Sequence, residues 1–251
     1  MSRFIISALA LITSVFTQAQ SEVKDSILFD PHITISYAHQ FPGGDMSSRF
    51  KNNHNVGMGF HFKDKKSWYY GVEGSYFFGS HVIAPAGFMQ NLYVDGKYIL
   101  DNDGQIATIS LQERGWTLTA NGGRLFNVLG PNVNSGILVY AGLGFMQHKI
   151  RIEHQETHIK QLEEEYLKGY DRLTNGLMVS GFAGYYHMSN NRLVNFMIGL
   201  EFMNGFTQSR RDLNFDTGTT DQQKRSDSLL GLRVGWTLHL YKRMADNYYY
   251  Y

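Results

Sequence analysis

Two histidines in a charged stretch have the spacing of a metal-binding pair. His154 and His158 are four residues apart, with Glu153 and Glu156 beside them. If the stretch is helical, both imidazoles lie on one face, where they could bind Zn²⁺. No third or fourth ligand is fixed by the spacing, which favours the simpler interpretation of a solvated helical face. We therefore expect neither a metal nor another cofactor.

A second candidate for chemistry is the run Tyr186-His187-Met188-Ser189-Asn190. It resembles the His-x-Ser-Asn element of the PagL-like lipid A deacylases, small outer-membrane barrels that use histidine as base and serine as nucleophile. The resemblance implies that His187 activates Ser189, with an acidic partner still to be found. The residues that follow depart from that family's pattern, and Ser-Asn-Asn is also an ordinary turn sequence. A deacylase is therefore the alternative to a non-enzymatic protein.

Other chemistries find little support. Asp101-Asn102-Asp103-Gly104 begins like a calcium loop but lacks the downstream glutamate, so we interpret it as a turn. The chain has no cysteine, which excludes a disulfide framework, a thiol nucleophile and a lipid-modified cysteine. A formal net charge of +1 provides no concentrated basic surface for nucleic acid.

The elements that must position these residues follow a period of two, which is typical of β-strands. Apolar residues alternate with small or polar ones most clearly in 56–62, 194–202 and 230–240. Four less regular segments are Ile33–Phe41, Trp68–Phe78, Arg114–Phe126 and Ile137–Ile152. An eighth, Leu177–Met188, is apolar on both faces, so its inward side stays open. For the fifth and sixth strands the pattern does not decide which side faces inward.

The connections between these segments alternate in length. The short ones are Lys63–Ser67, Asn127–Asn134 and Ser189–Arg192, and the long, polar ones are Pro42–Asn53, Gly79–Glu113, Glu153–Asn175 and Gln208–Asp227. Outer-membrane barrels have short periplasmic turns and long extracellular loops. The sequence therefore predicts an all-β fold, an eight-stranded antiparallel transmembrane up-and-down barrel in the cell outer membrane.

Aromatic residues support a membrane crossing. Aromatics form 14% of the chain, beside 26 glycines and four prolines, a composition that suits short strands. Trp68-Tyr69-Tyr70 lies beside a short turn, Tyr76-Phe77-Phe78 follows about one crossing later, and Trp236 and Tyr241 close the last strand. Two aromatic belts of this kind mark the two membrane interfaces.

Three charged residues fall on the inward faces of the expected strands. Glu73, Glu201 and Arg233 should meet inside the barrel, because an eight-stranded barrel is just filled by its side chains. Buried charges must be paired to avoid a cost of several kcal/mol each. We therefore expect a closed charge cluster with a structural role, and no open pore.

Both ends of the chain carry features outside the barrel. Residues 1–19 have a positive start, an apolar run and small residues before a cleavage point, which predicts a signal peptide. The barrel is then expected over residues 20–241, with a periplasmic tail over 242–251. Four terminal tyrosines, Tyr248, Tyr249, Tyr250 and Tyr251, could dock on a partner or lie in the membrane interface.

With the strands, the loops and Tyr170-Asp171-Arg172-Leu173-Thr174-Asn175-Gly176 considered together, the chain resembles the small outer-membrane barrels of Bacteroidetes-type bacteria, including PorG-like and PorT-like barrels of type IX secretion. The resemblance implies a structural or anchoring component of an envelope assembly, with outer-membrane lipid and other envelope proteins as partners and lipopolysaccharide as a further ligand to consider. A surface receptor or adhesin that binds through its loops is the remaining hypothesis.

Overall fold

The computed structural model describes residues 27–154, 159–162, 164–189 and 194–240. The expected signal peptide and the expected tyrosine tail both lie outside the described residues. Within the described part of the chain, none of the helices combines the length and the apolar character needed to cross a membrane.

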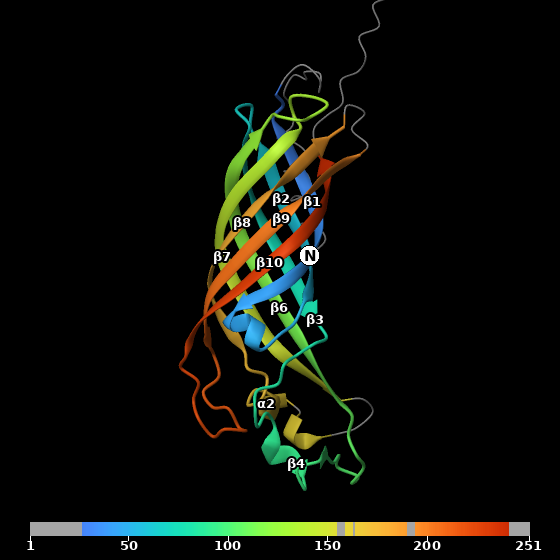
Figure 1. The fold of residues 1–251 in the computed structure, drawn as a ribbon, viewed down its shortest axis with the longest axis vertical. Helices are drawn as coiled ribbons and strands as arrows, with labels where there is room; N and C mark the ends of the chain where they lie inside the picture. Colours follow the sequence, from blue (N-terminus) through green and yellow to red (C-terminus); the bar gives the residue numbers. More distant parts are fainter. Residues whose placement is uncertain (1–26, 155–158, 163, 190–193, 241–251) are drawn as a thin grey trace, which may run out of the picture.

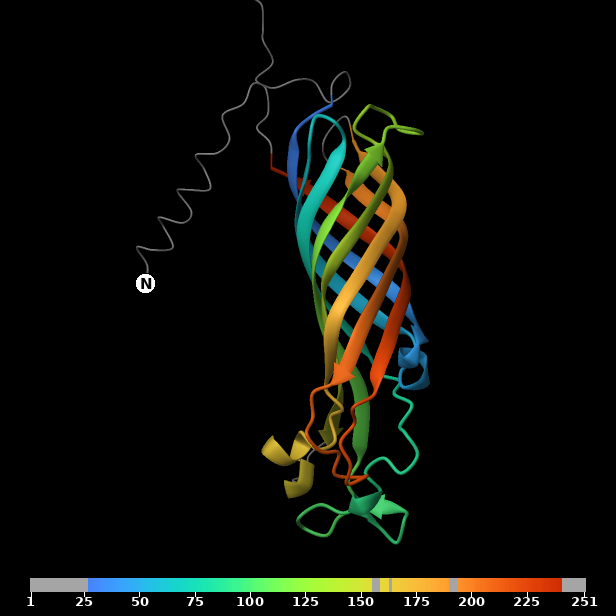
Figure 2. The same cartoon turned by 90° about the vertical axis from the view of Figure 1, so that its left-hand side faces the viewer.

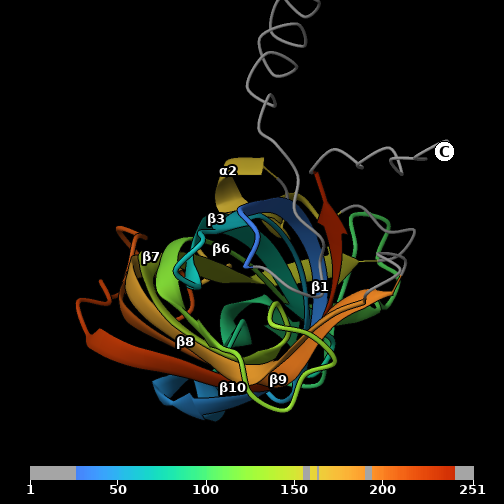
Figure 3. The same cartoon turned by 90° about the horizontal axis from the view of Figure 1, so that it is seen from above.

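Eight long strands form one closed antiparallel barrel, in which each strand pairs with its neighbours in sequence and the last pairs with the first (Figure 3). The barrel strands are β1 (Asp30–Gly44), β2 (Asn53–Lys63), β3 (Trp68–Gly79), β6 (Ile109–Phe126), β7 (Gly136–His154), β8 (Thr174–Met188), β9 (Asn195–Ser209) and β10 (Lys224–His239). All eight strands expected from the period of two are confirmed, and most are longer than their apolar alternation.

Side chains alternate between the outer wall and the lumen along each strand, as the pleat requires. The outer wall has an apolar band that includes Met58, Val72, Leu118, Leu143 and Leu200, all exposed. Apolar side chains in such a ring are stable only where lipid surrounds them. The outer wall is therefore that of a transmembrane barrel.

Aromatic girdles border this band at both ends. Toward the short turns they include Phe62, Trp68, Tyr70, Phe126, Tyr185, Phe196 and Trp236, and toward the long loops Tyr37, Phe41, Tyr76, Phe78, Trp116, Phe145 and Phe206. One part of the sequence interpretation was wrong, because Tyr69 and Phe77 point into the lumen, where they are buried, and belong to neither girdle. Alternation sends every second residue of an aromatic run inward.

The structure fixes the inward faces of the fifth and sixth strands. In β7 the inward residues include Leu138, Tyr140 and Met146, and in β8 Phe182 and Tyr186. These side chains are apolar or aromatic, so the inward face of these two strands lacks the polar residues that mark it in the other strands.

The long connections gather at one end of the barrel, with β4 and α2 among them, and the short turns at the other (Figure 1). Strands β6 and β7 are the longest, with 18 and 19 residues. The first residues of β6 and the last residues of β7 pair only with each other, from Ile109↔His154 to Gln112↔Arg151, and form an arm beyond the ring (Figure 2). This arm supports the loops.

Short elements lie within those loops. They are the 3-10 helices η1 (Asp45–Ser48), η2 (Gln90–Leu92) and η3 (Lys160–Leu162), the helix α2 (Glu164–Leu167), and a small hairpin of β4 (Tyr93–Val94) and β5 (Tyr98–Ile99). We call residues 80–108, 159–173 and 210–223, apart from residue 163, the cap.

Candidate functional site

Three charged side chains meet at mid-height in the lumen. The guanidinium of Arg233 lies 2.7 Å from Glu73 Oε1 and 3.5 Å from Glu201 Oε2. Arg233 also donates to Ser36 Oγ at 2.9 Å and to Tyr140 Oη at 3.1 Å. Strands β1, β3, β7, β9 and β10 thereby meet in one cluster, which we call the central ion cluster.

The central ion cluster fills its level of the lumen. Gln40 Nε2 donates to Glu201 Oε1 at 2.5 Å. The cavity beside Arg233, lined also by Thr119, Asn121 and Ser180, measures about 10 Å³. That is room for about one water molecule, so this level of the barrel is a plug and not a conduit.

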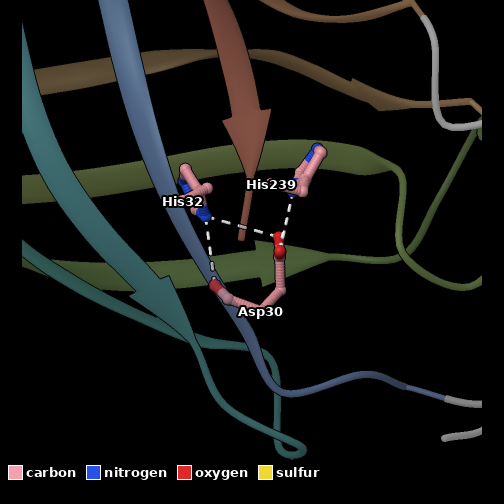
Figure 4. Close-up of side chains that lie close together, drawn as sticks. All are labelled: Asp30, His32 and His239. Atoms are coloured by element: carbon pink, nitrogen blue, oxygen red, sulfur yellow. Dashed lines mark hydrogen bonds and ion pairs between the residues drawn. The ribbon is translucent and has the colours of Figure 1, made fainter. Parts of the chain in front are cut away.

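A second polar cluster lies nearer the short turns and joins the first and last strands (Figure 4). Asp30 Oδ1 is 2.7 Å from His239 Nδ1, and Asp30 Oδ2 is 3.3 Å from His32 Nδ1. His32 Nε2 lies 3.3 Å from Tyr69 Oη, and the ring of His61 stacks on Tyr69 with centroids 5.0 Å apart. These contacts lock the seam where the barrel closes.

The donor set of Asp30, His32 and His239 has the composition of a metal site, a carboxylate and two imidazoles with ligand atoms within 4.8 Å of one another. Those atoms already hydrogen-bond to each other, so a metal ion would have to displace the bonds that close the seam. Sequence reasoning missed this cluster because Asp30 and His239 are 209 positions apart. The only signal available was that His32 and His239 fall on inward faces.

A buried lysine closes the periplasmic end of the lumen. Lys63 Nζ donates to the carbonyl of Leu28 at 3.0 Å and to Asn134 Oδ1 at 2.9 Å, and the side chain is almost wholly buried. The turn after β6 and the segment before β1 are thereby tied together over the opening.

The opposite end of the lumen is closed by the first long loop. Arg49, which follows η1, forms an ion pair with the buried Asp227 of β10. His148 Nε2 lies 2.9 Å from Asp227 Oδ2, and Thr207 Oγ1 donates to the same oxygen at 2.5 Å. Buried apolar residues fill the space around these groups.

The cap has a hydrophobic core of its own that continues the packing of the lumen. Its buried members are Phe88, Met89, Ile99, Ile159, Leu162 and Tyr170, packed with Ile150 and Ile152 of β7. Gly169 lies so close to Phe215 that an added Cβ would be 2.3 Å from ring carbons. Only glycine allows this contact, which joins the third and fourth long loops.

Polar contacts link the same loops. Arg172 forms two bonds to the Asp216 carboxylate at 2.5 and 2.6 Å, and Arg211 two to Asp171 at 2.5 and 2.7 Å. Asn91 Nδ2 of the second long loop donates to Tyr170 Oη at 2.8 Å. Burial raises the pKa of the Tyr170 phenol, which keeps it in its neutral form. The cap is therefore a folded unit and not a set of separate loops.

His187 and Ser189, the residues of the deacylase-like motif, lie outside the lumen clusters and outside the cap. His187 faces the outer wall near the short turns, where its ring stacks on Phe196 with centroids 4.9 Å apart. Ser189 follows the end of β8 at that same end, and its backbone N–H donates to Asn195 Oδ1 at 2.9 Å. The short-turn end is the periplasmic end, away from lipid A in the outer leaflet.

The two loop motifs have different outcomes. His154 ends β7, whereas His158 lies outside the described residues. The Asp101 motif is a turn, as expected, because Asp101 Oδ1 accepts the N–H groups of Asp103 at 2.9 Å and Gln105 at 2.7 Å.

The chain matches no protein-family model, and no curated protein matches its sequence. Among solved structures it is similar to Ail of Yersinia pestis in complex with the heparin analogue sucrose octasulfate, at 14% identity and a TM-score of 0.44 over 84% of this chain and 99% of that one.

Neisserial surface protein A gives 9% identity and a TM-score of 0.45 over 84% and 97% of the two chains. The outer membrane protein OprG from Pseudomonas aeruginosa gives 11% and 0.37 over 88% and 100%. Likenesses this weak assign neither a family nor a ligand. The closed ring of eight strands and its apolar outer wall make the chain a small outer-membrane barrel. Kinship with the PorG-like and PorT-like barrels stays a prediction.

Proposed function

We propose that this protein is a non-enzymatic outer-membrane barrel that anchors a component of an envelope assembly through its extracellular cap. The observation that carries the proposal is that the long loops fold into one packed cap on a filled barrel. Ordering loops costs conformational entropy, which is offset here by a core and buried ion pairs. A preformed surface of this kind binds a partner without a further ordering cost.

The surface of the cap supports a protein contact. Several apolar side chains of the cap are exposed: Tyr93, Val94 and Ile106 lie in the second long loop, and Tyr166 and Leu213 in the third and fourth. Apolar groups gathered on a folded loop surface are typical of interaction sites. Ile106 is the most exposed of these, at 67%.

The filled lumen favours anchoring over transport. The central ion cluster, the contacts of Asp30 with His32 and His239, and the contacts of Asp227 with Arg49 and His148 fill the lumen at three heights. A solute would have to break each in turn, and unpaired buried charges cost several kcal/mol each.

The test is a pull-down in mild detergent of the membrane-inserted protein, followed by mass spectrometry. One variant replaces Tyr93, Val94 and Ile106 with serine. A matched control replaces Val128 and Leu129, exposed apolar residues at a short turn, with serine. We expect stoichiometric envelope partners with the unmodified chain and the control, and their loss with the cap variant.

The same experiment tests the finer parts of the proposal. Partners that belong to a secretion assembly would support a role in type IX secretion. Partners lost on removal of Tyr248 to Tyr251, but kept in the cap variant, would move the contact to the tail. A barrel without partners in every case contradicts anchoring.

A surface receptor is the second candidate, and the same exposed apolar residues of the cap favour it. A receptor would bind an external ligand in the absence of envelope partners. Trimming residues 80–108, the part of the second long loop between β3 and β6, would then abolish ligand binding while the barrel stays folded.

A further inference from the structure

One stretch of the outer wall carries a groove where the apolar band ends and the cap begins. The groove is about 400 Å³ in volume. Its wall on the side of the membrane is formed by Tyr76 and Trp116, which belong to the girdle toward the long loops. Its edge on the side of the cap is formed by Leu167 and Leu173 of the third long loop. Because the girdle marks the membrane interface, the groove lies at the level of the outer-leaflet headgroups.

Three cations line this groove. Arg114, Lys149 and Arg151 lie on the outward faces of β6 and β7, between the girdle and the cap. The register sets Arg114 opposite Lys149 and Gln112 opposite Arg151. Like charges directly opposite across two strands repel each other. An anion bound between them would remove that repulsion.

The carboxylates nearby leave the groove basic. Arg151 lies 2.8 Å from Glu153, but the two side chains are 54% and 35% exposed, so solvent screens the pair. Lys149 is 3.8 Å from Asp171, whose carboxylate already receives two bonds from Arg211.

Arg114 contacts uncharged oxygens, the carbonyl of Glu113 and the side chain of Gln112. Within the described residues it forms no ion pair. Its guanidinium is therefore available to an anion.

The basic surface continues along the same face of the barrel. Arg210 Nε donates to Asn175 Oδ1 at 2.6 Å, and Asn175 Nδ2 donates to Gln147 Oε1 at 3.2 Å. The side chain of Gln147 lies beside Trp116 in the register. Amides and a guanidinium group thus form a hydrogen-bonding strip over β7 and β8 that ends at Arg210, the residue after β9.

The opposite face differs at the same height. There the outward residues of β1 and β2 are Tyr37, His39, Phe41 and His54, and the groove beside His39 and His54 has one lysine, Lys51, against the three cations of the groove on β6 and β7. A general attraction to the membrane surface would not require this asymmetry.

We propose that the groove of Arg114, Lys149 and Arg151 binds the phosphate group of a phosphorylated glycolipid in the outer leaflet, while Tyr76 and Trp116 contact its acyl chains. Arginine matches phosphate because its planar guanidinium can donate two parallel hydrogen bonds. The aromatic wall and the two leucines enclose the part of the lipid where the headgroup meets the chains.

The test uses the full chain in dodecyl maltoside micelles, which contain no phosphate. Trp116 becomes the sole tryptophan when Trp68 and Trp236 are replaced by phenylalanine, so its emission reports on the groove. The probes are bis-phosphorylated lipid A, the same lipid after removal of its phosphates, and inorganic pyrophosphate.

We expect saturable binding of bis-phosphorylated lipid A, weakened by salt. The variant R114Q/K149Q/R151Q should lose at least about tenfold in affinity, because it removes all three cations that line the groove. The charge-keeping variant R114K/R151K should bind more weakly than the unmodified chain but more tightly than the triple glutamine variant, because lysine keeps the charge and loses the paired bonds of the guanidinium. The control K65Q/K66Q/K97Q removes three exposed lysines elsewhere and should bind like the unmodified chain.

Three results would overturn the proposal. They are equal binding by the triple glutamine variant, equal binding of the dephosphorylated lipid, and binding of pyrophosphate as tight as that of the lipid. Circular dichroism of each variant confirms a folded barrel. The cap variant used for the anchoring test should keep its lipid affinity, so failure of one proposal is distinguishable from failure of the other.

Discussion

In the barrel each strand is fixed by backbone hydrogen bonds to two neighbours, whereas in the cap the loops are fixed mainly by side chains. Backbone ladders tolerate many side-chain changes, because every residue contributes the same groups. Side-chain contacts depend on a few residues each. The ladder joins all eight strands into one unit, so an uncompensated charge buried in the lumen destabilises the whole barrel, whereas loss of a cap contact acts on the loops that it joins.

The largest effect is expected in the lumen. Arg233→Ala leaves Glu73 and Glu201 buried without their counter-charge, which should lower the free energy of unfolding by about 3–5 kcal/mol. Urea titration of the protein in lipid vesicles measures this. The triple variant E73Q/E201Q/R233M should recover most of the loss, because it leaves no buried charge unpaired. An unchanged midpoint for Arg233→Ala would mean that the central ion cluster carries no stability.

A smaller effect is expected at the contact between loops. Gly169→Ala places a methyl group against the Phe215 ring, so the two must separate at a cost of about 1–3 kcal/mol to the cap. Limited proteolysis should cut the cap faster, with the urea midpoint of the barrel unchanged. Gly122→Ala is the control, since its Cβ would meet nothing within 4 Å. A shifted barrel midpoint would show that cap and barrel unfold together.

The ion pair of Arg172 and Asp216 should matter less than the packing at Gly169. A double-mutant cycle with Arg172→Gln and Asp216→Asn should give a coupling free energy of about 1 kcal/mol, because Arg172 Nη2 donates to both carboxylate oxygens and the Asp216 side chain is buried. Hydrogen exchange of cap amides measures it. Additive effects of the two substitutions would contradict the coupling.

The smallest effect is expected at the surface of the cap. Lys168 pairs with Glu165, but both side chains are more than half exposed. Lys168→Gln should change cap stability by less than about 0.5 kcal/mol in the same exchange measurement, because solvent screens exposed pairs. A larger change would mean that surface charges help to hold the cap.

Prediction from sequence succeeded where the signal is local. Alternation in β2, β9 and β10 identified the strands and the inward charges, because the two faces of each strand meet lipid and lumen. The same signal failed for β8, whose inward residues include Phe182 and Tyr186. The prediction of two aromatic belts was also wrong for Tyr69 and Phe77, because alternation along β3 turns both side chains into the lumen.

The sequence by itself determined the strand number, the two kinds of connection and the inward positions of Glu73, Glu201 and Arg233, since each depends on residues close together in the chain. The tertiary structure decided the rest. Asp30 meets His239 only because the first and last strands pair, and Arg114 faces Lys149 only through the register of β6 and β7. Gly169 contacts Phe215 only once two loops fold together. Contacts between distant segments are set by closure and packing, which leave no periodic trace in the sequence.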